Sequence, residues 1–71
     1  MTKDLHYLLP HQKRVVEEKR ELDGRIKRLT AFLQNVQDCP AAEQERLRAQ
    51  LHHMEMYSGV LNERVQHFGR G

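Results

Sequence analysis

The chain has 71 residues, of which 38% are hydrophobic and 31% charged, with a formal net charge of +2 and one cysteine. This length allows one small domain, and a single cysteine excludes an internal disulfide. The small net charge does not indicate a nucleic-acid-binding protein. No apolar run approaches the roughly 20 residues that cross a bilayer, and no stretch resembles a secretory signal, so the sequence predicts a cytoplasmic protein.

Residues 1–9 are predicted to form a short docked N-terminal segment, because three leucines in it have helical spacing. Pro10 interrupts this segment and suits the first turn of a following helix, where its missing N–H costs nothing. That helix is predicted over 10–36, and Gly24 within it is expected to be a tolerated surface glycine. Its apolar residues recur at steps of four and three and form a stripe along one side of the helix, which we call its seam. Lys19 interrupts this seam, which consists of Val15, Leu22, Ile26, Leu29, Leu33 and Val36.

Residues 37–42 are predicted to form the turn, with Asp38 as a helix cap and Pro40 in the first turn of the next helix. The second helix is predicted over 43–68 and ends before a glycine-containing tail, 69–71. Its seam has the same spacing and one polar member, and consists of Leu47, Leu51, Met54, Ser58, Leu61, Val65 and Phe68.

Two such seams joined by a short turn predict an all-α fold, an antiparallel two-helix hairpin that forms a single domain over 1–71. A chain this short buries too little surface to be stabilised comfortably by one internal core. Apolar residues also lie outside the seams, where one facing helix cannot cover them: Val16, Phe32, Met56, Tyr57 and Val60. We therefore expect the hairpin to assemble into a helical homo-oligomer.

No group of residues in the sequence indicates catalysis, a metal site or a cofactor, so we do not expect an enzyme. His52 and His53 are adjacent, and adjacent residues on a helix point about 100° apart, so the pair cannot hold one ion without ligands from another chain. Cys39 lies in the predicted turn and is expected to be an exposed thiol without a chemical role. Ser58 lacks a nucleophile motif and is expected to admit close approach or to fix the register of the seam.

Cationic and polar residues gather at the open end of the predicted hairpin. The first helix is the basic one, with a net charge of +3 over residues 11–36 against −1 over residues 43–68. Its N-terminus also attracts anions through the helix dipole. The candidate ligand-binding residues, which supply cations, an amide and an aromatic surface for a phosphate-bearing molecule, are His11, Gln12, Arg14, Lys19, Tyr57 and Arg64.

Two of these features also have purely structural explanations. The charges at the open end are equally explained as solvated residues at helix ends. Lys19 is expected opposite Val60 and Leu61, where it can lay its stem on the seam and meet a glutamate such as Glu18 of a neighbouring chain. The alternative for Lys19 is a phosphate-binding lysine at a subunit boundary, and the residues alone leave both readings open.

Three stretches of the chain carry a resemblance: PHQKRVVEEKRELDGRIKRLTAF from residue 10, EQERLRAQL from residue 43 and HMEMYSGVLNERV from residue 53. Together they resemble a family of small phage helical-hairpin proteins first met in crAss-like phages. The six candidate ligand-binding residues all lie in matching stretches. The chain departs from the family pattern at Gly24, and residues 1–9 do not align with it, so the resemblance implies no role for His6 or Tyr7.

The resemblance implies a phage origin, and the size and hairpin architecture are similar to those of phage sponges of the anti-CBASS and anti-Thoeris type. Such sponges sequester cyclic oligonucleotides or related signalling nucleotides. The expected function is therefore sequestration of a nucleotide immune messenger in the host bacterial cytoplasm. The alternative is a coiled-coil module that binds a host or phage protein. A third, weaker hypothesis is a nucleic-acid-binding accessory factor that uses Lys13, Arg14, Arg20, Lys27 and Arg28.

Overall fold

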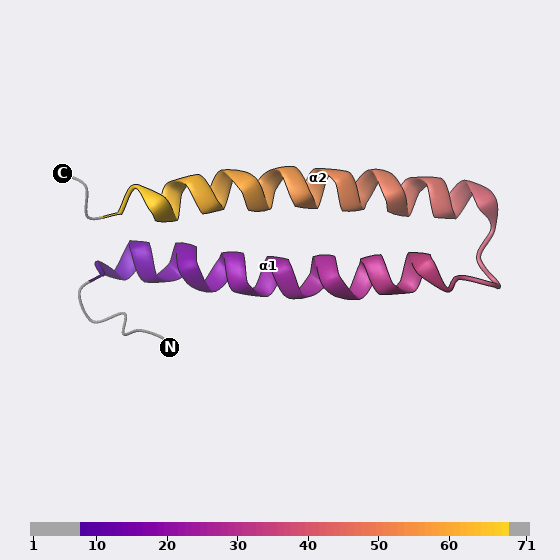
Figure 1. The fold of residues 1–71 in the computed structure, drawn as a ribbon, viewed down its shortest axis with the longest axis horizontal. Coiled ribbons are helices and arrows are strands. Elements are labelled where there is room, and N and C mark those ends of the chain that lie inside the picture. Colours follow the sequence, from indigo (N-terminus) through magenta and orange to yellow (C-terminus); the bar gives the residue numbers. More distant parts are fainter. Residues whose placement is uncertain (1–7, 69–71) are drawn as a thin grey trace.

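The protein is a hairpin of two long antiparallel helices (Figure 1). The computed structural model describes residues 8–68, so the predicted N-terminal segment, apart from its last two residues, and the tail 69–71 lie outside the described residues. Helix α1 spans Pro10–Gln34 and helix α2 spans Ala41–Gln66. The molecule measures 48 × 21 × 15 Å. It is therefore about one helix thick, and the predicted all-α hairpin is confirmed.

Helix α1 begins where the sequence predicts, with Pro10 as its first residue. Leu9 precedes it in an extended conformation, and its backbone N–H donates to Gln12 Oε1 at 2.9 Å. Leu9 has no side-chain acceptor, so Gln12 alone supplies a side-chain bond at this helix start. The helix continues unbroken through Gly24, where an added Cβ would meet only the Arg28 side chain at 3.5 Å, an ordinary contact. Gly24 is thus a tolerated glycine, as predicted.

The turn lies two residues earlier than predicted. Helix α1 ends at Gln34 instead of Val36, and helix α2 begins at Ala41 instead of Glu43. Pro40 is the N-cap of α2 and not a residue of its first turn, and the prediction that Asp38 caps the helix is wrong because it lies two residues further out. No side chain caps α2.

Main-chain and amide bonds hold the start of α2 instead. The Gln44 backbone N–H donates to the Pro40 carbonyl, and Gln44 Nε2 donates to the Cys39 carbonyl at 2.7 Å. Glu43 in the first turn meets the positive end of the helix dipole, as expected. At its other end α2 stops at Gln66, with His67 as C-cap, two residues before the predicted end.

The two seams pack against each other along the whole hairpin, as predicted, and every seam member is buried or half-buried. Leu61 is fully buried, while Val15 and Leu22 are each 6% exposed. These three form the core together with four half-buried neighbours, Ile26, Met54, Val65 and Phe68. The core therefore lies in the half of the hairpin nearest the open end.

Of the five apolar residues predicted outside the seams, four are exposed, whereas Val16 is half-buried. Leu9, Phe32, Met56, Tyr57 and Val60 are all at least 43% exposed. Neither described helix is long and apolar enough to cross a membrane. The single hairpin thus leaves much of its apolar side-chain surface in contact with solvent.

Replacing Leu61 by Ala is expected to lower the free energy of unfolding by about 2 to 5 kcal/mol, because it leaves a cavity at the one fully buried side chain. Arg20→Ala, at an exposed position of α1, is expected to change it by less than about 0.5 kcal/mol. Urea unfolding followed by circular dichroism, at one protein concentration, compares the two variants. Equal losses would contradict the assignment of the core.

Candidate functional site

The polar residues that interrupt the two seams, Lys19 in α1 and Ser58 in α2, face each other across the hairpin. Lys19 Nζ lies 2.6 Å from Asp23 Oδ2 and donates to Ser58 Oγ at 3.4 Å. Ser58 Oγ in turn donates to Asp23 Oδ1 at 2.6 Å. Lys19 therefore reaches Ser58, about one turn along α2 from the Val60 and Leu61 position that the sequence predicted, because Ser58 offers a hydroxyl partner in the facing seam.

This polar cluster fixes the register of the hairpin and occupies the Lys19 ammonium. The hydrogen bonds from Lys19 and then from Ser58 hold the pKa of Asp23 below its usual value. The Lys19 side chain is 23% exposed and that of Asp23 is 46% exposed, so the ion pair itself contributes little to stability. The lysine is already paired within its own hairpin, and a phosphate would have to compete with Asp23 for it.

A second polar contact joins the helices on one edge of the hairpin. The Tyr57 hydroxyl donates to Glu18 Oε2 at 2.6 Å. This hydrogen bond raises the pKa of Tyr57, because ionising the phenol would break the bond and set two negative charges together, and the positive charge of Arg64 partly opposes the rise. Arg64 therefore lies within electrostatic reach of Tyr57.

The Glu18–Tyr57 contact also locates His11 and Arg64. Residues seven apart lie on the same side of a helix, about 10 Å along its axis. Seven residues from Glu18 toward the open end is His11, and seven residues from Tyr57 toward the same end is Arg64. His11 and Arg64 thus lie across from each other on the edge that carries Glu18 and Tyr57, which we call the tyrosine edge.

Arg14 extends this edge on the outer side of α1, three residues after His11 and four before Glu18. Four of the six candidate residues, His11, Arg14, Tyr57 and Arg64, therefore line one edge near the open end, where Figure 1 shows the start of α1 beside the end of α2. All four are exposed. The first turn of α1 contains no acidic residue that would compensate its dipole, so this end of the hairpin favours an anion.

The other two candidate residues have partners inside the hairpin. Gln12 Oε1 accepts the Leu9 N–H, and Lys19 belongs to the polar cluster with Asp23 and Ser58. Sequence spacing did not show this difference, because it identifies which side of a helix a residue lies on and not which partner its polar atom takes. On a single hairpin the tyrosine edge is an open surface and not an enclosed pocket.

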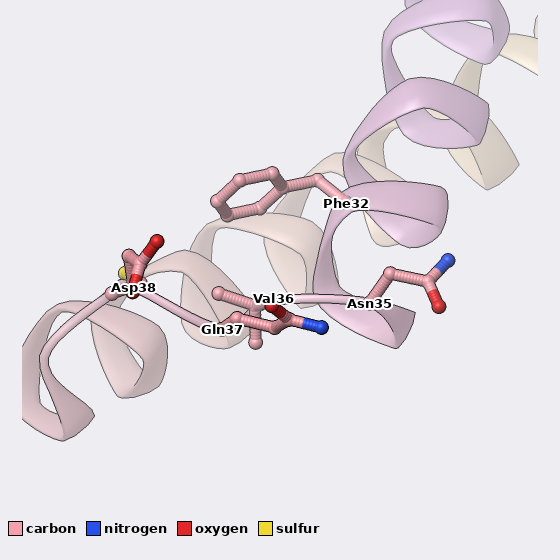
Figure 2. A pocket seen from close by; sticks show the side chains of 6 residues that line it. Phe32, Asn35, Val36, Gln37 and Asp38 are labelled. Carbon is pink, nitrogen blue, oxygen red and sulfur yellow. The ribbon is translucent and has the colours of Figure 1, made fainter.

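A hollow of about 300 Å³ lies at the opposite end of the molecule, around the turn. Figure 2 shows the Phe32 ring on one side of it and the turn residues on the other. Its lining consists of Phe32, Asn35, Val36, Gln37, Asp38 and Cys39. It carries one carboxylate and no cation, so it does not suit a phosphate. Cys39, predicted to be an exposed thiol, is half-buried there. The hollow was not predicted, because its lining depends on where the turn lies, and the prediction placed the turn two residues too late.

Within residues 8–68 no group of three or more His, Cys, Asp or Glu side chains is arranged to hold a metal ion. The rings of His52 and His53 are 5.7 Å apart and inclined at 60°. Both side chains are exposed. The tyrosine edge is therefore the strongest candidate site in this part of the chain, and its chemistry is that of anion binding.

Comparison with known proteins identifies a family. A family model described as Sequestin matches residues 9–67, which include both helices and the six candidate ligand-binding residues. Neither the curated proteins nor the solved structures give a match.

The polar cluster predicts a defined pH dependence of stability. The pKa of Asp23 is lower in the folded chain than its ordinary value of 3.8, so its contribution is present above that value and is lost as the pH falls through the folded pKa. Asp23→Asn is expected to lower the melting temperature at neutral pH, and this difference from wild type should shrink below about pH 4. Thermal melts followed by circular dichroism test this. A difference in melting temperature between wild type and Asp23→Asn that stays constant below about pH 4 would contradict it.

The Tyr57–Glu18 bond predicts a spectroscopic shift. In a Tyr7→Phe background, Tyr57 is the only tyrosine, and its ultraviolet titration reports its ionisation directly. Glu18→Gln removes the negative acceptor and is expected to lower the pKa of Tyr57 toward its ordinary value of 10.0. Glu17→Gln, one residue along and also exposed, is the matched control and should leave the titration unchanged. An unchanged curve in the Glu18 variant would exclude the contact in solution.

Proposed function

The chain belongs to the Sequestin family, and we propose that it is a phage anti-defence protein that binds and sequesters a nucleotide second messenger of host immunity. The family match over residues 9–67 is the observation that carries this proposal, because the family name points to sequestration of a ligand. The identity of the ligand, its phosphate chemistry and the phage origin belong to the proposal.

The tyrosine edge supports a ligand with phosphate groups. Arg14 and Arg64 come from different helices, and each carries a guanidinium fork that can bind two oxygens of one phosphate. His11 adds a further donor beside them, and Tyr57 offers an aromatic surface on which a base can stack. Glu18, an acidic side chain on this edge, accepts the Tyr57 hydroxyl, which gives its charge a partner.

Gln12 and Lys19 take part in this proposal only as secondary contacts. Gln12 has amide N–H groups besides the oxygen that accepts from Leu9, and these can reach a ligand without breaking that bond. Lys19 would have to exchange Asp23 for a phosphate oxygen. We therefore assign the larger share of the binding free energy to the two arginines.

Sequestration requires no catalysis, so we propose that the protein is not an enzyme and needs no cofactor. It acts in stoichiometric amount in the host bacterial cytoplasm. Its dissociation constant for the messenger must lie below the concentration at which the messenger activates its receptor. Binding of this kind benefits from a preformed site, since ordering loops on binding costs free energy. Residues on two packed helices meet this need better than residues on a loop.

The alternative is a coiled-coil module that binds a host or phage protein, and the exposed apolar residues of α2 favour it: Met56, Tyr57 and Val60. Nucleic-acid binding is a weaker hypothesis, because the positive charges of Arg20, Lys27 and Arg28 on α1 are partly offset by four acidic residues of the same helix: Glu17, Glu18, Glu21 and Asp23. The two leading hypotheses differ in the partner, so a direct binding measurement distinguishes them.

Calorimetric titration of cyclic dinucleotides, cyclic trinucleotides and cyclic ADP-ribose isomers into the wild-type protein tests the proposal. We expect one member to bind more tightly than about 10 μM. Arg14→Ala and Arg64→Ala should each weaken that ligand about tenfold or more, because each removes charge-assisted bonds of about 1.5 to 3 kcal/mol.

Arg28→Ala is the matched control. Arg28 lies 14 residues after Arg14 on the same side of α1, about 21 Å along its axis, and is equally exposed. It should leave the affinity unchanged. No binding by any member of the panel would reject the proposal for these ligands and favour the protein-binding alternative. Binding that both arginine variants retain would place the site elsewhere on the chain.

A further inference from the structure

The solvent-facing side of α2 carries a second row of residues with seam spacing. Steps of three and four lead along it from Arg46 through Ala49, His53, Met56 and Val60 to Glu63. All six are exposed, and they lie on the side of α2 away from α1, since none belongs to the packed seam. We call this the outer row of α2. Its four central members carry no formal charge at neutral pH, and it ends in a cation on one side and an anion on the other.

The exposed surfaces of the two helices differ in composition. From Ala49 to Asn62, α2 contains one formally charged residue, Glu55, whereas from Glu17 to Arg28, α1 contains nine charged residues out of twelve. Apolar residues of α1 are concentrated on its seam, but those of α2 are distributed around the helix. A helix that is apolar on more than one side is usually buried on more than one side. The composition therefore marks the outer row of α2 as an interface and the outer side of α1 as solvent-exposed.

We propose that a second copy of this chain covers the outer row of α2, so that the two α2 helices pack together in the centre and the two α1 helices lie outside. The helices run antiparallel about a twofold axis between His53 and Met56. This arrangement sets Ala49 against Val60 of the partner subunit, and His53 against Met56 of the partner subunit. Each pair occurs twice, as twofold symmetry requires.

The charges at the ends of the row support this direction. In the antiparallel arrangement Arg46 meets Glu63 of the partner subunit at both ends, whereas a parallel arrangement would set like charges together. Arg46 contacts Glu43 of its own helix at 2.9 Å, but the Arg46 side chain is 70% exposed, so this pair is readily exchanged. Gly59 flanks the row, and an added Cβ there would meet no atom within 4 Å. The partner helix can therefore approach closely.

The proposed dimer borders the tyrosine edge without depending on it. Tyr57 lies between the seam and the outer row, and Arg64 follows Glu63 at the end of the row. The second copy would therefore form a wall beside an edge that is open on a single hairpin. The dimer needs no ligand, so a failure to bind nucleotides leaves this inference intact.

Two alanines provide a matched test. Ala49 lies on the outer row of α2 and Ala31 lies on the outer side of α1, and both are exposed helical residues. Sedimentation velocity at micromolar concentration should show a dimer or a multiple of dimers for wild type and for Ala31→Glu. Ala49→Glu should raise the dissociation constant of the dimer about tenfold or more, since it sets a charge against Val60 of the partner subunit. Circular dichroism checks that both variants remain helical.

The charge pair tests the direction of packing. Arg46→Glu and Glu63→Arg should each weaken the dimer, and the double variant should restore it. A monomeric wild type, or an Ala49→Glu variant that assembles as wild type does, would overturn the proposal. Dissociation by Ala31→Glu would also overturn it, because the interface would then include α1. A double variant weaker than both single variants would reject the antiparallel pairing.

Discussion

The contact between the two seams is the interaction on which the rest of the structure depends. Each helix has one partner, so each can bury only one stripe of side chains, and the hairpin has no second layer. Leu61, Val15 and Leu22 lie at the centre of that contact and are the most deeply buried side chains in it. All other side chains lie at its margins or face away from it. The candidate site lies beside the seam because the seam side chains are buried or half-buried and leave little surface for a ligand.

The polar residues in the two seams determine the register of the helices, and hence which residues of α1 and α2 lie beside each other along the edges of the hairpin. An uninterrupted apolar seam tolerates sliding by a heptad, because each step presents similar side chains. Lys19 and Ser58 satisfy each other in only one register, and Asp23 bonds to both. That register brings Glu18 to Tyr57 and, one heptad further, His11 to Arg64. The polar cluster thus gives up some packing free energy, and in return it defines which residues share the tyrosine edge.

The spacing of apolar residues in the sequence was sufficient to predict how the two helices pack. Both seams, the polar residues that interrupt them and the antiparallel pairing follow from steps of three and four. They are confirmed, because every seam member is buried or half-buried and the two helices run antiparallel. The helix ends near the turn were misplaced by two residues, because they depend on local bonds such as Gln44 to the Cys39 carbonyl, which spacing does not reveal. For the same reason the sequence grouped Gln12 and Lys19 with the exposed candidates. Gln12 accepts from the Leu9 N–H, three residues away at the helix start, whereas only the register of the two helices brings Lys19 to Ser58.

The division of charge between the helices would connect the proposed dimer to the proposed sequestration of a ligand. If α2 lies inside a dimer, the charged α1 helices form its outer surface, and each tyrosine edge lies where an outer helix meets the central pair. A ligand that contacts residues from both subunits binds the dimer more tightly than the monomer and therefore stabilises it by mass action. A ligand that contacts one hairpin only does not change the association of the subunits. The dependence of dimer stability on nucleotide concentration is therefore the property that separates a shared site from two independent ones.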